Sequence, residues 1–160
     1  MSSAAYSRTQ IILHWVVAAL VLFQLFLHGS IVEAWTGRMN GSLPNQPTPD
    51  LHVIAGVLIF GLVVWRLILR FTRSVPALPT QEPQLLKVVA TGTHLLFYVL
   101  LLAMPLSGAV AWFLGAEPAA LAHSLARFAL IPLLALHVLA ALAHHFWFRT
   151  NVLRRMLGRA

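Results

Sequence analysis

The sequence predicts an all-α integral membrane protein, a bundle of four transmembrane helices with both termini in the cytoplasm. Of its 160 residues, 59% are hydrophobic and 9% are charged, whereas soluble domains carry about 25% charged residues. The mean hydropathy is +0.82. Four apolar runs also reach the roughly 20 residues that a helix needs to cross a bilayer. These observations favour one membrane domain that spans residues 1–160.

The first two spans are expected at about residues 11–29 and 51–71. Residues 11–29 include a histidine and are not followed by a small-residue cleavage site, so we do not expect a cleavable signal peptide. Residues 30–50 are rich in proline, glycine and asparagine and are expected to form an outer loop. Because backbone groups in lipid must bond within their own segment, each span should be helical.

The third and fourth spans are expected at about residues 88–114 and 123–148, joined by a short outer turn. Each contains an internal proline, Pro105 in the third and Pro132 in the fourth. Proline removes a backbone hydrogen bond and can kink a helix. The fourth span is unusual because it carries four histidines in a largely apolar run. The stretch HHFWFRTNVLRRML suggests that its helix continues beyond residue 148 into the cytoplasm.

Basic residues gather on one side of the predicted spans. The other side carries Arg38 with Glu33, Asp50 and Glu117. Because cytoplasmic loops are enriched in Lys and Arg, the basic side should be cytoplasmic. The net charge of +7 then reflects topology, and nucleic acid is not an expected partner. The basic side holds Arg8, Arg70, Arg73, Lys87, Arg149, Arg154, Arg155 and Arg159.

The chain has eight histidines and no cysteine. The lack of cysteine excludes disulfides, iron–sulfur clusters and covalently attached c-type haem. Histidines inside a membrane span indicate a functional site. Apart from methionine, they are the strong ligands that this chain offers to haem iron.

Two of these histidines face the same way on the fourth span. His137 follows His123 by 14 residues, which gives a rise of about 21 Å and a turn about 40° short of four full circles. His52, at the outer end of the second span, can face His123, and His14, at the inner end of the first, can face His137. Two imidazoles from different helices are what a bis-histidine haem requires. At the inner level, depth leaves His144 and His145 open as alternatives to His137.

Two arginines and two glycines extend this hypothesis. Arg66 and Arg127 lie inside spans that contain no acidic partner, so a haem propionate could supply the missing charge. The alternative is that both snorkel to lipid headgroups. Gly56 and Gly108 could leave room for a macrocycle, or could simply allow close helix contact.

The remaining histidines have simpler interpretations. His28 lies at the outer end of the first span and is expected at the interface. His144 and His145 lie beside Trp147, which is typical of the aromatic belt at a membrane surface. His94 near the inner end of the third span could bond a propionate, serve a quinone site or make a helix contact.

The sequence also resembles the bacterial cytochrome b561 family. The resemblance covers all four spans and nearly the whole chain, through YSRTQIILHW, LHVIAGVLIFGLVVWRLILR, THLLFYVLLLAMPLSG, LHVLAALAHHF and the terminal NVLRRM. It implies a multi-pass protein of the bacterial inner membrane with two haems b, one held by His14 and His137 and the other by His52 and His123. The resemblance thereby selects His137 at the inner level.

The resemblance further implies an oxidoreductase that exchanges electrons with ubiquinone. Superoxide is the favoured outer donor, by analogy with a superoxide:ubiquinone oxidoreductase of the family. The outer loops lack an excess of positive charge that would steer an anion, which leaves that substrate open. A quinone is expected near the inner haem, close to His94, Arg8 and Gln10.

Two other functions are considered. The chain could be a membrane anchor and electron conduit that receives electrons from a periplasmic redox protein. It could also be a metal or proton transporter that uses histidines as a pathway, although its spans lack the acidic residues that such pathways contain. The sequence identifies no catalytic residue; membrane lipid and a quinone are the partners it predicts.

Overall fold

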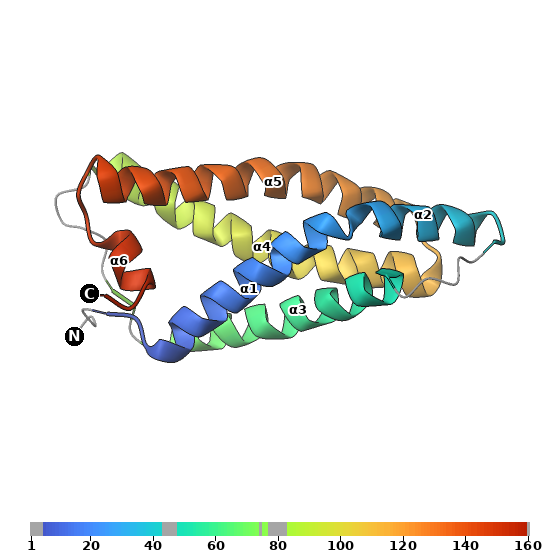
Figure 1. Cartoon of the computed structure of the whole chain (residues 1–160), viewed down its shortest axis with the longest axis horizontal. Helices are drawn as coiled ribbons and strands as arrows, with labels where there is room; N and C mark the ends of the chain where they lie inside the picture. Colours follow the sequence, from blue (N-terminus) through green and yellow to red (C-terminus); the bar gives the residue numbers. More distant parts are fainter. Residues whose placement is uncertain (1–4, 43–47, 74, 77–82, 160) are drawn as a thin grey trace.

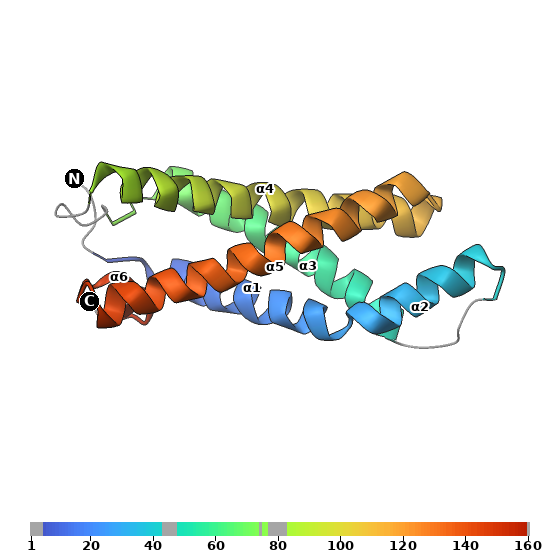
Figure 2. The ribbon, with the colours of Figure 1, turned by 90° about the horizontal axis from the view of Figure 1, so that it is seen from above.

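The computed structural model describes residues 5–42, 48–73, 75–76 and 83–159. These residues form helices joined by short connections, with no strand among them. Four of the helices are long and apolar enough to cross a membrane. They run side by side along the molecule (Figures 1 and 2). The predicted all-α fold with four membrane helices is therefore confirmed.

The first membrane helix, α1, spans Arg8–Phe26. Its start is fixed by Ser7, whose hydroxyl accepts from the backbone N–H of Gln10 at 3.3 Å, while the Gln10 side chain accepts from the N–H of Ser7 at 2.9 Å. This reciprocal cap satisfies two backbone donors that a helix start otherwise leaves free. Gln10, which we expected near a quinone, is thus occupied in capping.

The predicted outer loop is partly a helix, which corrects the sequence prediction. Helix α2 spans His28–Met39 and projects at the end of the molecule opposite α6 (Figure 1). Leu27 keeps a helical backbone between α1 and α2, and its N–H still bonds the carbonyl of Phe23 at 3.2 Å. Helical geometry therefore continues past the apolar span. The polar residues and glycines of this segment made it resemble a loop, and residues 43–47 lie outside the described part.

The other membrane helices begin before their predicted bounds, and the last of them also ends before its predicted end. Helix α3 spans Thr48–Thr72, α4 spans Gln84–Leu114 and α5 spans Glu117–Phe146. Gly115 ends α4 with a backbone φ of 67°, a left-handed conformation that glycine adopts without strain. Pro105 and Pro132 lie inside α4 and α5 without ending them.

The fourth span does not continue as a straight helix, contrary to what its C-terminal sequence suggested. Helix α5 ends at Phe146, Arg149 adopts a left-handed φ of 53°, and the chain turns back into α6, Val152–Met156. The indole N–H of Trp15 donates to the carbonyl of Met156 at 2.9 Å. The start of α1 and the C-terminal segment therefore lie at the same end of the bundle (Figure 1). That this end is cytoplasmic stays a prediction.

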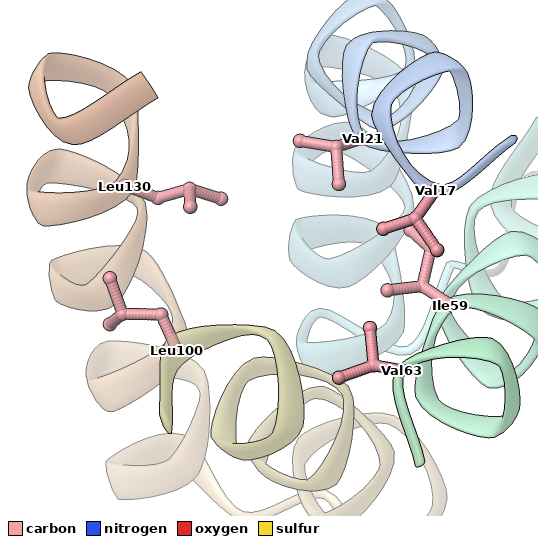
Figure 3. Packing of buried hydrophobic residues seen from close by; sticks show 6 residues of the cluster. All are labelled: Val17, Val21, Ile59, Val63, Leu100 and Leu130. Atoms are coloured by element: carbon pink, nitrogen blue, oxygen red, sulfur yellow. The ribbon is translucent and has the colours of Figure 1, made fainter. Parts of the chain in front are cut away.

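A small aliphatic core joins the helices near their midpoints (Figure 3). Along α3 these residues fall between His52 and Arg66, and along α5 between His123 and His137. The core therefore separates an outer level from an inner level. Its buried members are Val17, Val21, Ile59, Val63, Leu100 and Leu130.

Helix packing is uneven around the bundle. Helix α4 packs along α5, α1 packs along α3, and α3 also packs against α4. Within the described residues, neither α1 nor α3 packs closely against α5. The distance from α5 to α1 or α3 is therefore larger than the distance between two packed helices, and side chains of these helices meet across that larger distance.

Candidate functional site: two histidine pairs

The outer pair joins α3 to α5. The ring centres of His52 and His123 are 6.2 Å apart, with an angle of 62° between the ring planes. His52 lies in the first turns of α3 and His123 in the second turn of α5. Because α3 and α5 both begin at this end of the bundle and run in the same direction (Figure 1), both residues fall at the same level. The structure thus brings together the two residues that the sequence analysis paired.

The inner pair joins α1 to α5. The ring centres of His14 and His137 are 6.3 Å apart, with an interplanar angle of 55°. His144 instead lies against Thr150, with 3.2 Å between Nδ1 and the hydroxyl oxygen, and its ring contacts Phe148. His145 contacts the neighbouring ring of Phe146. Of the alternatives at the inner level, His137 is the residue that faces His14.

The spacing within each pair suits one metal ion between two imidazoles. A nitrogen of imidazole binds a metal at about 2 Å, so two rings on opposite sides of one ion have centres about 6 Å apart. Both pairs match this distance. Both also bridge helices that are not closely packed on each other, which leaves width for a flat macrocycle. Haem b therefore fits the two pairs, although the ligation itself stays a prediction.

A hydrogen bond and a glycine orient His123. Its Nδ1–H donates to the backbone carbonyl of Met104 at 2.8 Å, which leaves Nε2 free to bind a metal. A Cβ on Gly108 would lie 3.1 Å from Nδ1 and 3.2 Å from Cε1 of this ring. Gly108 thus makes room for the imidazole itself, a closer role than the macrocycle gap that we expected.

A cavity of about 190 Å³ surrounds the outer pair. Within the described residues, the three buried side-chain atoms that lack a hydrogen-bond partner all belong to residues that line it: Oε1 of Gln24, Nδ1 of His52 and Nε of Arg127. Buried polar atoms are normally bonded. Their concentration around one cavity indicates a place built for a polar or charged ligand group.

The outer cavity is also electropositive. The Arg127 guanidinium lies 4.9 Å above the ring of Phe128 and lines the cavity together with His28. Partial burial, and then the positive charges of Arg127 and His123, lower the pKa of His28 below its usual value. Of these causes, burial disfavours any charge, whereas the positive charge of Arg127 favours an anion in the cavity. His28, which we had expected only at an interface, thus belongs to this cavity.

At the inner pair, Arg66 contacts His14 directly. Its Nη2–H donates to Nδ1 of His14 at 3.2 Å. Since arginine can only donate, Nδ1 of His14 accepts here and the ring proton resides on Nε2. The sequence had placed Arg66 in the inner half of its span, and the structure shows which histidine it meets.

His94 also reaches the inner pair. Its ring centre lies 5.5 Å from that of His137, nearly perpendicular to it, and Phe97 contacts the same ring at 5.2 Å. Nδ1–H of His94 donates to the carbonyl of Ala90 at 2.7 Å, so Nε2 is its free acceptor. His94 is exposed on α4. It therefore lies between the inner pair and the surroundings of the bundle.

Sequence reasoning missed the polar and aromatic residues that surround the outer pair. Gln24 donates from Nε2 to the backbone carbonyl of His52 at 2.9 Å, and a Cβ on Gly56 would lie 3.4 Å from the same Nε2. Trp35 of α2 and Trp112 of α4 line the cavity. A glutamine in the middle of an apolar span was the available signal, because such residues are rare in membrane helices.

Comparisons with known proteins found a matching family model and several similar proteins. The family described as prokaryotic cytochrome b561 matches residues 5–159. Cytochrome b562 of Cereibacter sphaeroides is 34% identical to this chain, over 95% of the chain and 94% of that protein. Cytochrome b561 homolog 1 of Escherichia coli is 28% identical, over 96% and 97%. The probable superoxide oxidase CybB of Yersinia pestis is 27% identical, over 96% of each.

Proposed function

Because the chain belongs to the prokaryotic cytochrome b561 family, we propose that it binds two haems b and carries electrons between an outer donor, superoxide in the version that we favour, and ubiquinone. The chain is a multi-pass b-type cytochrome of the bacterial inner membrane that takes part in electron transfer.

The observation that carries the proposal is the presence of two histidine pairs of nearly equal spacing, 6.2 and 6.3 Å, one at each level of the bundle. Haem b held by two imidazoles supplies one-electron transfer, because no coordination position stays open for a substrate. His52 with His123 would hold one group and His14 with His137 the other. Sites at two levels connect the two faces of the membrane.

The residues of the outer cavity suit an anionic partner. The buried Nε of Arg127 is unpaired, and the same cavity contains His28 and the small residues Gly56 and Gly108. A propionate could take the free Arg127 donor. The positive charge also favours approach of superoxide, which the composition of the outer loops alone did not predict. Two superoxide anions would each lose one electron and leave as dioxygen.

At the inner level, Arg66 supports the same proposal. If His14 binds a metal through Nε2, its ring proton moves to Nδ1, which can then no longer accept from Arg66. The guanidinium must find another acceptor, and a propionate carboxylate is the partner that we expect. The pairing of a buried cation with an anion also removes the cost of leaving it alone in an apolar bundle.

Ubiquinone is proposed to react on the inner side, close to His94. One ubiquinone would take the two electrons together with two protons to form ubiquinol. His94 is exposed on α4 and contacts His137, and its Nε2 is free to exchange a proton. A hydrogen-bonding imidazole at the bundle surface suits a lipid-soluble quinone that approaches from the bilayer.

The test is an optical redox assay on the purified protein. We expect the absorption spectrum to show that superoxide reduces the b-type haem and that ubiquinone reoxidises it. Arg127→Gln should slow the superoxide step and leave reduction by dithionite unchanged, and Arg149→Gln, at the other end of the bundle, is the matched control. A haem signal that superoxide leaves oxidised would contradict superoxide as the donor.

A second candidate is an electron conduit that serves a periplasmic redox protein. It is favoured by α2, which gives the outer face a helix of 12 residues where the sequence predicted only a loop. The cation of Arg38 over the ring of Trp112, at 5.6 Å, fixes this helix against α4. Reduction of the haem by a periplasmic protein fraction but not by superoxide would favour this function.

A further inference from the structure

The backbone of His52 accepts a hydrogen bond from a side chain of a different helix. Gln24 lies near the outer end of α1, and its Nε2 donates to the His52 carbonyl at 2.9 Å. A helical carbonyl already accepts from the N–H four residues later, so this bond is additional. It ties α1 to the residue of α3 that carries the imidazole.

This bond determines the orientation of the Gln24 amide, that is, which of its nitrogen and oxygen atoms faces the His52 carbonyl. A backbone carbonyl can only accept, so the amide nitrogen must be the atom that meets it. The amide oxygen is then left over. This oxygen is buried and has no hydrogen-bond partner. It is bonded to the same carbon as Nε2, so it lies close to the His52 carbonyl that Nε2 bonds.

Gln24 has an acceptor atom without a donor, and His52 has a ring nitrogen without an acceptor. Its Nδ1 is buried and has no partner. A histidine that binds a metal through Nε2 carries a proton on Nδ1, and such ligands nearly always donate that proton to an acceptor. Arg127 Nε, the other unpartnered buried side-chain atom within the described residues, is itself a donor. That leaves Oε1 of Gln24 as the acceptor in this group of three.

We propose that Gln24 is the positioning residue of the outer haem ligand: Oε1 accepts the Nδ1–H of His52 in the haem-loaded protein, while Nε2 holds the His52 backbone. This inference rests on the proposed function, because it needs a haem at the outer pair. It gives His52 what the Met104 carbonyl gives His123. With both imidazoles donating to an acceptor, each becomes a stronger electron donor to the metal.

The test compares three variants by redox titration and haem content. Gln24→Met keeps the length of the side chain but removes the acceptor, so the outer haem should rise in potential or bind on the order of ten-fold more weakly. Gln24→Glu keeps an acceptor oxygen, so its outer potential should lie at or below that of the wild type. Gln10→Met, the same change in the same helix at the inner end, should leave the outer haem unaltered.

The outcomes separate this inference from the proposed function. Loss of one haem component in His123→Ala identifies the outer one. A wild type with fewer than two haems contradicts the proposed function, whatever Gln24 does. Two haems with an outer component that Gln24→Met leaves unchanged in potential and content would overturn the role of Gln24. If Gln24→Glu shares the defect of Gln24→Met, the lost bond from Nε2 to the His52 carbonyl explains both and the acceptor role is wrong.

Discussion

The two histidine pairs have almost the same spacing but opposite surroundings. In the outer pair, His123 donates to a carbonyl and His52 lies beside an unused amide oxygen. In the inner pair, His14 meets the guanidinium of Arg66, and aromatic edges flank His137. Each pair has an arginine beside it, Arg127 at the outer level and Arg66 at the inner level, so the difference lies in the acceptors of the outer imidazoles, which make them more basic ligands and lower the potential of a bound metal. The outer haem should therefore have the lower potential, so that electrons pass inward.

The largest expected effect is loss of one haem at a time. His123→Ala should leave one b-type haem per chain, and His137→Ala should leave the other, because each substitution removes one of two axial ligands. Pyridine haemochrome analysis against protein concentration measures the ratio. His144→Ala, which changes a histidine that faces Thr150, should retain both haems. Two haems in His123→Ala would show that the outer pairing is wrong.

Crowding the outer imidazole should have the next largest effect. In Gly108→Val the added atoms collide with a ring that lies about 3.1 Å from the new Cβ, and such overpacking costs about 1–3 kcal/mol. We expect reduced occupancy of the outer haem and normal occupancy of the inner one. Gly92→Val on the same helix is the control, since its Cβ would have nothing within 4 Å. Equal haem content in both variants would contradict the contact.

Removing the inner cation should shift a potential without loss of haem. Arg66→Ala takes a positive charge away from His14, so the inner haem potential should fall, by an amount on the order of tens of millivolts. Arg66→Lys should restore most of it. Arg70→Ala, one turn further along α3 and beside Tyr98, should have less effect. An unchanged inner potential in Arg66→Ala would contradict a role of the Arg66 charge in setting that potential.

The smallest expected effect concerns the segments that cover the two ends. Arg38→Ala removes the cation above Trp112 that holds α2 to α4, a contact worth about 0.5–1 kcal/mol at an exposed site. The midpoint of thermal unfolding should fall slightly while both haem potentials stay unchanged. Trp15→Phe, which removes the bond to the Met156 carbonyl at the opposite end, should have a similar small effect. A shifted outer potential in Arg38→Ala would mean that α2 does more than cover the outer cavity.

The membrane helices and the pairing of the histidines were predictable from the sequence. The length of each apolar run determines the first, and helical geometry determines the second. Fourteen residues between His123 and His137 place both on one side of α5, and the structure gives each a partner on another helix. Depth alone left His144 and His145 as alternatives, because it depends on where α5 ends. The turn at Arg149 is a backbone feature with no apolar signature.

The surroundings of each histidine were less predictable. The bond from Gln24 to His52 joins residues 28 positions apart in the chain, and it depends on how α1 and α3 are rotated. Gly108 was recognised as small, but its neighbour was not known. The helix α2 was missed because two glycines and several polar residues interrupt the apolar pattern, although a helical backbone at Leu27 continues α1 into it.

The most direct measurement is a potentiometric titration of the purified protein, followed in the haem absorption bands, for wild type, His123→Ala and His137→Ala. We predict two components of equal size in the wild type, with the lower-potential component absent from His123→Ala and the higher-potential component absent from His137→Ala. A single component in the wild type, or the opposite assignment, would contradict the difference between the outer and inner pairs.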